Sequence, residues 1–155
     1  MTSTKADDPD WFNGAKVALL CAGSVVTLLR DDKPGLPFAN MWDFPGGGRE
    51  GDETPEQTVL RETEEEISLA LPPERLVWKL EARAASAGAP RIWFFGGWIT
   101  EAETKAMHLG DEGQALRMMP VAEFVERPDA ISSLKVRLNL LLQARPDLLD
   151  QGVSG

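Results

Sequence analysis

The sequence contains a single cysteine, Cys21, and no apolar run close to the roughly 20 residues that a membrane-spanning helix needs. A lone cysteine excludes an intrachain disulfide, which fits a reducing compartment. Residues 1–10 are polar and acidic and lack the basic and apolar regions of a signal peptide. We therefore expect a cytoplasmic protein without a membrane partner. Cys21 lies in an apolar run and is interpreted as a small buried hydrophobe.

Basic residues are also scarce, since acidic residues outnumber them by 25 to 16 and the formal net charge is −9. This balance argues against a protein dedicated to binding nucleic acid. A chain of 155 residues with 43% apolar content can form one domain with a sizeable core. We expect this domain to span residues 15–146, between a polar extension at 1–14 and a flexible tail at 147–155. The sequence predicts no oligomeric state.

Apolar and β-branched segments separated by turn residues predict strands along the chain. The predicted strands lie at 15–21, 24–30, 41–44, 76–82, 91–100 and 115–119. Helices are predicted at 55–67 and 129–144, the second from apolar residues at helical spacing. Residues 45–48 predict a turn, 84–90 a loop, and 101–113 an irregular or briefly helical segment. Strands interleaved with helices indicate an α/β domain of the α+β type, with a mixed sheet between helical layers.

The first predicted helix has strong start signals. Thr54 is a candidate N-cap, Pro55 suits the first helical position, and Gln57 completes a capping box with Thr54. Because Pro72 cannot continue a helix, this one is expected to end near Ile67.

The same helix concentrates negative charge. Between Glu50 and Glu66 the chain carries eight acidic residues and one basic residue, a net charge of −7. Glu62, Glu65 and Glu66 are spaced i, i+3 and i+4, which places all three on one helix face. Like charges at this spacing destabilise the helix, and a bound divalent cation reverses that effect. Because the ligands are hard oxygens, the pattern predicts Mg²⁺, with Mn²⁺ as a substitute.

Neighbouring residues support this interpretation. Arg61 lies one turn before Glu65 and can hold its carboxylate, whereas Glu64 should point into solvent. The glycines at 46–48 let the backbone approach a ligand closely, and the helix N-terminus behind them favours anions. A glycine turn that leads into a capped helix with three carboxylates on one face predicts a site for a metal ion and an anionic ligand.

The stretch from Gly47 to Leu69 resembles the Nudix box, in which a glycine and five charged residues recur at fixed spacings over 23 residues. Those positions are filled here by Gly47, Glu53, Arg61, Glu62, Glu65 and Glu66. Two softer positions depart from the motif. Thr63 stands where an aliphatic residue is usual and should weaken helix packing, and Ser68 replaces the usual glycine and should alter how the helix ends.

Flanking segments agree with this resemblance. Residues 41–48 resemble the usual lead-in to the box, and residues 53–57 resemble MutT-like members of the family. The resemblance implies the α/β/α sandwich of Nudix hydrolases. It also implies hydrolysis of a diphosphate linkage in a nucleotide derivative, with Mg²⁺ as cofactor and a small-molecule nucleotide as partner, not a nucleic acid.

The resemblance further implies roles for the residues of the box. The metal ligands would be Glu62, Glu65 and Glu66, together with the Gly46 carbonyl. Glu53 would lie behind these ligands or assist a metal-bound water, and Arg61 would orient the carboxylates.

Residues outside the box complete the implied site. The segment 111–114 resembles one that often supplies a further catalytic and metal-binding carboxylate, here Glu112, with Glu101, Glu103 and Asp111 as alternatives. Arg30, Gly46 and Gly47 would contact the substrate. A solvated loop acid and a plain surface arginine remain the alternative interpretations of Glu112 and Arg30.

The absence of tyrosine bears on the substrate, because family members that cleave diadenosine polyphosphates commonly carry one beyond the box. ADP-ribose members often carry a proline at a position where this chain has Ala85, and the nearest downstream proline is Pro90. No coenzyme A signature precedes the box. Elimination therefore favours a (d)NTP or modified (d)NTP, cleaved to the monophosphate and pyrophosphate. ADP-ribose or nucleotide-sugar hydrolysis, and a non-catalytic nucleotide-sensing domain, are the alternatives.

Aromatic residues in the predicted strands are candidates for stacking against a base. They are Trp42, Trp78, Trp93, Phe94, Phe95 and Trp98. Because side chains alternate along a strand, about half of them are expected to be ordinary core.

Overall fold

The computed structural model describes residues 11–83 and 90–152. In this part of the chain the strands form one sheet of seven, in the order β3-β2-β1-β6-β5, with β4 also paired with β1 and β7 with β2. The strands are β1 (Gly14–Cys21), β2 (Ser24–Leu29), β3 (Trp42–Asp43), β4 (Gly46–Gly48), β5 (Leu76–Arg83), β6 (Arg91–Trp98) and β7 (Ala115–Pro120). The β1–β6 pair is parallel and the others are antiparallel, so the predicted mixed sheet is confirmed.

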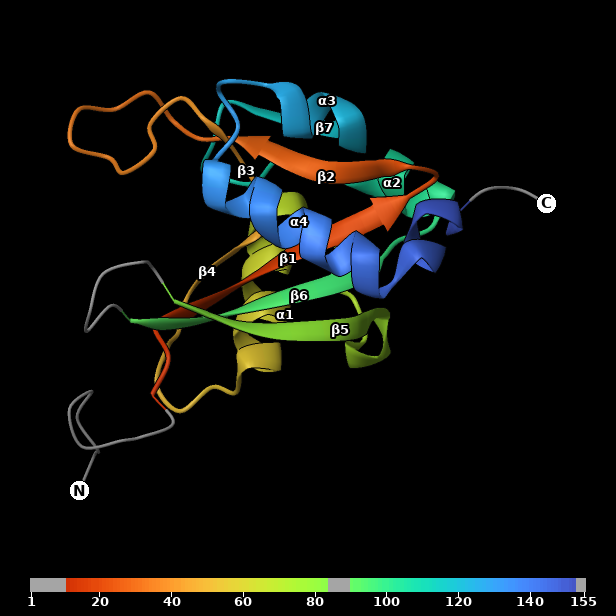
Figure 1. Cartoon of the computed structure of the whole chain (residues 1–155). Coiled ribbons are helices and arrows are strands. Elements are labelled where there is room, and N and C mark those ends of the chain that lie inside the picture. Colours follow the sequence, from red (N-terminus) through yellow and green to blue (C-terminus); the bar gives the residue numbers. More distant parts are fainter. Residues whose placement is uncertain (1–10, 84–89, 153–155) are drawn as a thin grey trace.

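Helices cover both faces of the sheet (Figure 1). Helix α1 (Pro55–Ile67) lies behind the sheet in this view, and α4 (Ser132–Ala144) lies in front of it. Two shorter helices, α2 (Glu101–Ala106) and α3 (Val121–Glu126), flank β7 in the chain, and 3₁₀ turns occupy Pro73–Arg75 and Pro146–Asp150. This arrangement is the expected α/β/α sandwich.

The sheet separates two apolar cores, and alternation along β1 assigns side chains to each. Ala18 and Leu20 pack on the α4 side, whereas Val17 and Leu19 pack on the α1 side. Because strand side chains alternate, Lys16 belongs to the α4 side of the sheet. The one charge in β1 thus faces α4.

Helix α1 begins as the sequence predicts. The Gln57 N–H donates to the Thr54 hydroxyl, and the Thr54 N–H donates to the Gln57 side chain, which is the expected capping box. The helix ends at Ile67, followed by Ser68 in the left-handed conformation with φ of 62°. Ser68 therefore adopts the backbone conformation that the usual glycine would take more easily.

Several sequence expectations differ from the structure. Residues 46–48 form strand β4 and not merely a turn, because glycine lets this segment pair closely with β1. Helix α3 was not predicted, and α4 begins at Ser132 instead of residue 129. Of the predicted loop at 84–90, residues 84–89 lie outside the described residues.

The packed unit also extends beyond the expected boundaries. Phe12 is buried, although it falls in the predicted polar extension. Leu148 is buried in the core on the α4 side and belongs to a 3₁₀ turn, although it falls in the predicted flexible tail. Single apolar residues near each end account for both differences, since burying one large side chain is worth about 2 kcal/mol.

Candidate active site

The acidic face of α1 is organised around Arg61. Its Nε donates to Glu53 Oε2 at 2.7 Å, its Nη1 donates to Glu62 Oε1 at 3.0 Å and to both Glu65 oxygens at 3.3 Å, and its Nη2 donates to the Gly48 carbonyl at 2.9 Å. One guanidinium therefore ties the glycine strand to three carboxylates. The contact between Arg61 and Glu65 that the spacing predicts is present.

Glu53 belongs to this network, whereas Glu64 lies outside it. The hydrogen bond from Arg61 lowers the pKa of Glu53 to about 2, so this carboxylate stays ionised at neutral pH. Glu64 is exposed and, as expected, does not join the contacts that Arg61 makes.

Glu66 has the most unusual environment of the α1 carboxylates. Its Oε1 accepts the Gly46 N–H at 2.9 Å, across the narrow gap between α1 and β4. Burial raises the pKa of Glu66 to about 7, partly offset by Lys16. A carboxyl group whose pKa stays near neutral despite Lys16 is suited to receiving a metal ion.

The two glycines with predicted substrate contacts have clear packing roles. A Cβ on Gly46, where φ is 140°, would lie 2.1 Å from the Ala15 carbonyl oxygen. A Cβ on Gly47 would lie 2.6 Å from the Glu62 carboxyl carbon. The Gly46 carbonyl, predicted as a metal ligand, accepts Lys16 Nζ at 3.4 Å. These glycines let β1, β4 and the α1 carboxylates come close together.

The segment that carries Glu112 is anchored on two sides. Towards α1, the Gly110 N–H donates to the Glu66 carbonyl at 2.9 Å, and a Cβ on Gly110 would clash with the backbone of α1. Towards β2, the Gly113 N–H donates to Asp31 Oδ1 at 3.1 Å. These anchors bring a residue 46 positions after Glu66 in the sequence to the same opening in the structure.

We call this opening the carboxylate hollow, with a volume of about 530 Å³. Its lining consists of Glu50, Glu62, Glu65, Glu66, Asp111 and Glu112. Glu112 and Asp111 thus lie with the α1 carboxylates. Of the other two alternatives, Glu103 caps α2 and pairs with Arg75 at 2.6 Å, and Glu101 lies in the first turn of α2. Neither lines the hollow.

Oxygen donors of this kind fit Mg²⁺, which needs only a few carboxylates and completes its shell with water and phosphate. Within the described residues, however, no three His, Cys, Asp or Glu side chains are already arranged as ligands of one ion. Glu62 and Glu65 are turned towards Arg61 instead, because the guanidinium is the nearest positive charge. The donor set fits a divalent cation, and an ion held by Glu62 and Glu65 would require both side chains to rotate away from Arg61.

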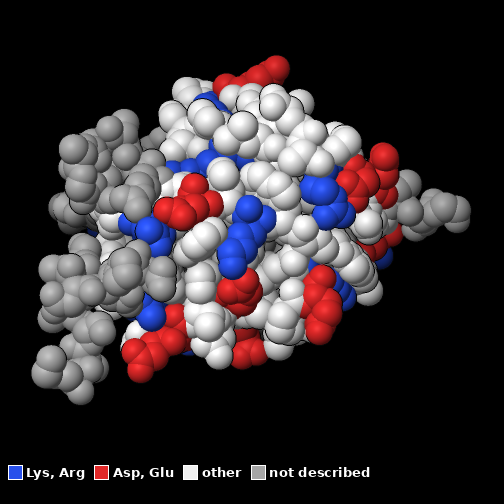
Figure 2. Space-filling model, turned by 60° about the horizontal axis from the view of Figure 1, so that its bottom comes forward, with Lys and Arg blue, Asp and Glu red and all other residues white. Residues whose placement is uncertain are grey.

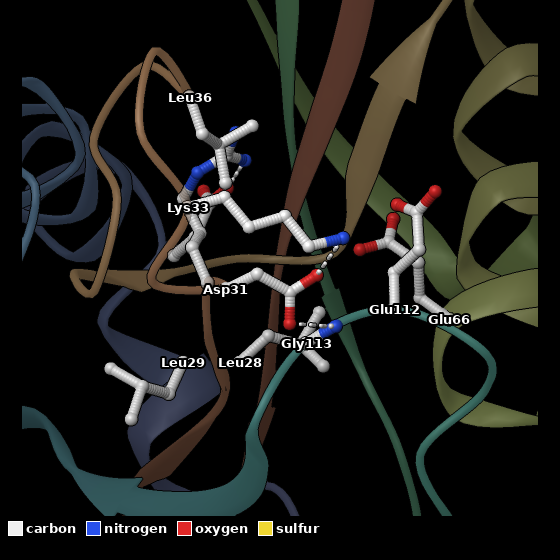
Figure 3. A pocket seen from close by; sticks show the side chains of 10 residues that line it. Leu28, Leu29, Asp31, Lys33, Leu36, Glu66, Glu112 and Gly113 are labelled. Carbon is white, nitrogen blue, oxygen red and sulfur yellow. Dashed lines mark hydrogen bonds and ion pairs between the residues drawn. The ribbon is translucent and has the colours of Figure 1, made fainter.

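A second, smaller opening of about 160 Å³ shares Glu66 and Glu112 with the first. We call it the junction hollow (Figure 3). In the figure, Lys33 extends from the loop after β2 towards the side where Glu66 and Glu112 lie, and it pairs with Asp31 at 3.6 Å. A cation therefore reaches the edge of the carboxylate cluster from a loop that the sequence did not single out.

Buried Asp43 organises the far side of the junction hollow. Its Oδ2 accepts Lys16 Nζ at 2.8 Å and Arg30 Nη1 at 3.1 Å. Arg30 Nε also donates to the Pro37 carbonyl at 3.0 Å. Arg30 thus lines the junction hollow, where Asp43 and the loop hold it, and its contact with a substrate stays a prediction.

A third opening of about 520 Å³, the α4 hollow, shares Arg30 and Asp43 with the junction hollow. It lies between the sheet and α4, and its lining includes Phe38, Ile131, Leu134 and Arg137. None of the six strand aromatics proposed for base stacking lines any of the three hollows. Phe94 and Phe95 are instead buried in opposite cores.

Sequence reasoning did not identify several of these residues. Lys16 is the single charge in an otherwise apolar strand, and Asp43 stands between Trp42 and Phe44. A charge inside an apolar run is the signal that could have found both, since burial of a charge requires a partner. Arg137 has no such signal in the sequence.

On the face that Figure 2 brings forward, acidic and basic side chains are interspersed and do not gather into a patch of one sign. Over the described residues, no helix combines the length and apolar character needed to cross a membrane.

A mixed sheet between helices, with a glycine strand and a carboxylate helix meeting at one opening, defines the class of domain. The chain belongs to the NUDIX family, because the family model described as NUDIX domain matches residues 13–140.

Two relatives and one solved structure illustrate this similarity. The RNA pyrophosphohydrolase of Alkalilimnicola ehrlichii is 32% identical over a match that covers 41% of this chain and 44% of the relative. The 8-oxo-dGTP diphosphatase of Proteus vulgaris is 61% identical over 32 residues, which are 21% of this chain and 29% of the relative. The matched stretches span less than half the length of each curated relative.

The solved structure is the NUDIX domain of Shewanella oneidensis NrtR complexed with ADP ribose. It aligns with a TM-score of 0.65 and 21% identity over 94% of both chains. This similarity concerns the fold.

Proposed function

We propose that this chain is a Mg²⁺-dependent hydrolase that cleaves a diphosphate linkage in a nucleotide, converting a (d)NTP or modified (d)NTP to the monophosphate and pyrophosphate. The carboxylate hollow carries this proposal. It brings Glu112 to the three α1 carboxylates, and one of these, Glu66, is partly buried beside a backbone N–H instead of an ion-pair partner. Carboxylates gathered in this way repel one another, Arg61 offsets only part of that repulsion because it contacts Glu62 and Glu65, and a bound divalent cation would offset more of it.

The residues have distinct tasks in this proposal. Glu62, Glu65, Glu66 and Glu112 would hold the metal ion, with Mn²⁺ as a substitute for Mg²⁺. The bound ion would neutralise phosphate charge and lower the pKa of the attacking water. Arg61 already contacts Glu53 and the Gly48 carbonyl. It would keep these two contacts when it releases Glu62 and Glu65.

The reaction is a displacement at phosphorus. A water oxygen forms a bond to one phosphorus, the bridging P–O bond breaks, and the water gives its proton to a base. Lys33 and Arg30 line the junction hollow beside this point and would contact the phosphate groups. Because cations there balance the carboxylates, an acidic substrate can enter an acidic protein.

The shared lining residues suggest how the substrate lies. A diphosphate between Glu66 and Glu112 reaches the junction hollow, and Arg30 and Asp43 connect that hollow to the α4 hollow. The α4 hollow is larger and combines apolar side chains with a few charged ones, so it is suited to the nucleoside.

The test is release of phosphate or pyrophosphate with Mg²⁺ from unmodified and oxidised (d)NTPs, ADP-ribose, nucleotide sugars and dinucleoside polyphosphates. Glu65→Gln serves as the inactive variant, and Glu64→Gln, on the exposed side of the same helix, is the matched control. Turnover of (d)NTPs by the wild type and the control, but not by Glu65→Gln, is expected. Tight binding of a nucleotide without turnover would favour the sensing domain, and turnover of ADP-ribose or a nucleotide sugar alone would replace the proposed substrate.

A further inference from the structure

The α4 hollow contains one cation, Arg137, that has no role in the proposed reaction and no acidic partner among the described residues. Three basic side chains line it, but Asp43 binds Lys16 and Arg30, and backbone carbonyls complete their contacts. Arg137, on α4, has neither a hydrogen-bond nor an ion-pair partner anywhere in residues 11–83 and 90–152. It is half-buried, and this burial lowers its pKa.

The position of Arg137 is determined by the packing of α4. Leu134, Leu138 and Leu141 are buried against the sheet, and Arg137 follows Leu134 by three positions, on the neighbouring strip of the helix. The start of α4 is held beside Asp43 by backbone bonds, because the Trp42 N–H donates to the Asp129 carbonyl and the Ile131 N–H donates to the Trp42 carbonyl. The packing of α4 therefore places Arg137 at the wall of the hollow.

An exposed aromatic side chain lies at the same hollow. Phe38 is 57% exposed and has φ of 55°, a conformation that bulky residues rarely adopt. The loop maintains it, since the Met41 N–H donates to the Phe38 carbonyl and the Asn40 N–H donates to the Asp31 carbonyl. Backbone strain of this kind concentrates at ligand sites. A flat ring held at the edge of an apolar hollow is a stacking surface for a second flat ring.

From these features we infer that the α4 hollow selects a 6-oxopurine, the base of guanine and hypoxanthine nucleotides, and that Arg137 determines the selection. A guanidinium has only donors, arranged as a planar fork. The O6 and N7 atoms of a 6-oxopurine are two adjacent acceptors that match this fork, whereas adenine presents an amino donor beside N7. Phe38 would stack on either purine, so discrimination would come from Arg137.

An additional phosphate is the competing partner for an unpaired guanidinium. The lining favours a base instead, because Phe38, Ile92, Ile131 and Leu134 contribute apolar surface to the same hollow as Arg137. Phosphate sites usually supply several N–H donors. In this hollow Asp43 binds Lys16, and Arg30 lies where the hollow meets the junction hollow, to which the proposed function assigns the phosphates, so Arg137 would be a single donor group. This inference rests on the proposed function for the direction in which the nucleotide lies.

The experiment compares kcat/KM for GTP, ITP and ATP with Mg²⁺ in the wild type, Arg137→Met and Asn139→Met. Methionine keeps an apolar stem and removes every donor, and Asn139 is an exposed residue of the same helix. We expect the wild type and Asn139→Met to prefer GTP and ITP over ATP by at least about tenfold. Arg137→Met should lose that preference through slower GTP and ITP turnover, with ATP turnover changed less than about threefold.

A binding measurement separates this inference from the proposed function. Calorimetric affinities for GMP and AMP need no turnover, so a GMP preference that disappears in Arg137→Met supports the inference even if no nucleotide is cleaved. Hydrolysis with equal affinity for GMP and AMP would overturn the inference and leave the proposed function standing. An Arg137-dependent preference for nucleotides with an additional phosphate would also overturn it. Circular dichroism and Tm confirm that each variant is folded.

Discussion

The carboxylate hollow and the α4 hollow each share lining residues with the junction hollow, but they are assembled in different ways. Glu62, Glu65 and Glu66 come from two turns of one helix, and a single distant loop adds Asp111 and Glu112. The α4 hollow combines β1, β6, the loop after β2 and α4. The first is a local pattern with surplus negative charge, and the second is a tertiary assembly with one unpaired positive charge. Substitutions can test whether the two hollows divide chemistry and recognition between them.

The largest effect is expected at the carboxylate hollow. Glu66→Gln should lower kcat by about a thousandfold, because it removes charge from a site where metal binding is worth several kcal/mol. Nucleotide affinity in the α4 hollow should change little. Steady-state kinetics with Glu64→Gln as control, and product binding by calorimetry, would show this. Loss of affinity equal to the loss of kcat would mean that the hollows are not separable.

The pH dependence of stability gives the next largest effect. The pKa of Glu66 is raised from 4.5 to about 7, so the folded chain binds a proton that the unfolded chain has released between these values. Metal-free protein should therefore lose stability as pH rises from 4.5 to 7, by about 3 kcal/mol at most from this group. Urea denaturation with a chelator at pH 5 and pH 8 measures the change, and Glu66→Gln should flatten it. Added Mg²⁺ should stabilise the protein more at pH 8 than at pH 5.

Substitution of Phe38 tests nucleotide binding at the α4 hollow, as substitution of Glu66 tests catalysis at the carboxylate hollow. Phe38→Asn should weaken binding of GMP and AMP alike by about tenfold, since stacking is worth about 1–3 kcal/mol per base. The same substitution should raise Tm slightly, because asparagine tolerates the left-handed conformation better than phenylalanine. Calorimetry and thermal unfolding check the two effects together. Unchanged affinity would remove Phe38 from the site.

Smaller effects are expected where the box departs from its usual residues. Thr63 is buried, and its hydroxyl has no hydrogen-bond partner within the described structure. Thr63→Val keeps the shape and removes the unsatisfied group, so the free energy of unfolding should rise by about 1 kcal/mol. Urea denaturation of the two proteins measures this. A decrease would show that the hydroxyl has a partner that stabilises the fold.

The smallest effect concerns the end of α1. Ser68 has φ of 62° as the C-cap residue, and Ser68→Gly should stabilise the protein by about 0.5 kcal/mol, because glycine adopts this conformation without a steric cost. Thermal unfolding tests the prediction. Equal stability of the wild type and Ser68→Gly would mean that the larger entropy that glycine loses on folding offsets the relief of strain.

Local sequence determined α1 almost completely. Its cap, its end and its carboxylate face depend on residues within four positions of one another, and helical geometry converts those spacings directly into contacts. The glycines at 46–48 were recognised as permitting close approach, but their pairing with β1 as a strand was not, because it depends on a partner 30 or more positions earlier. The prediction that some of the six strand aromatics stack against a base failed for a related reason. Aromatic content alone does not tell which side of a strand faces a cavity.

The sequence by itself determined the capped helix α1 and its carboxylates, because short-range spacing encodes them, and the resemblance of that stretch to the Nudix box implied the family and the α/β/α fold. Only the tertiary structure decided that Glu112 joins those carboxylates, that Asp43 holds Lys16 and Arg30, and that Arg137 and Phe38 share a hollow. These residues meet through sheet pairing and helix packing between segments far apart in the chain. Such contacts depend on the cooperative burial of the whole core, and no local spacing records them.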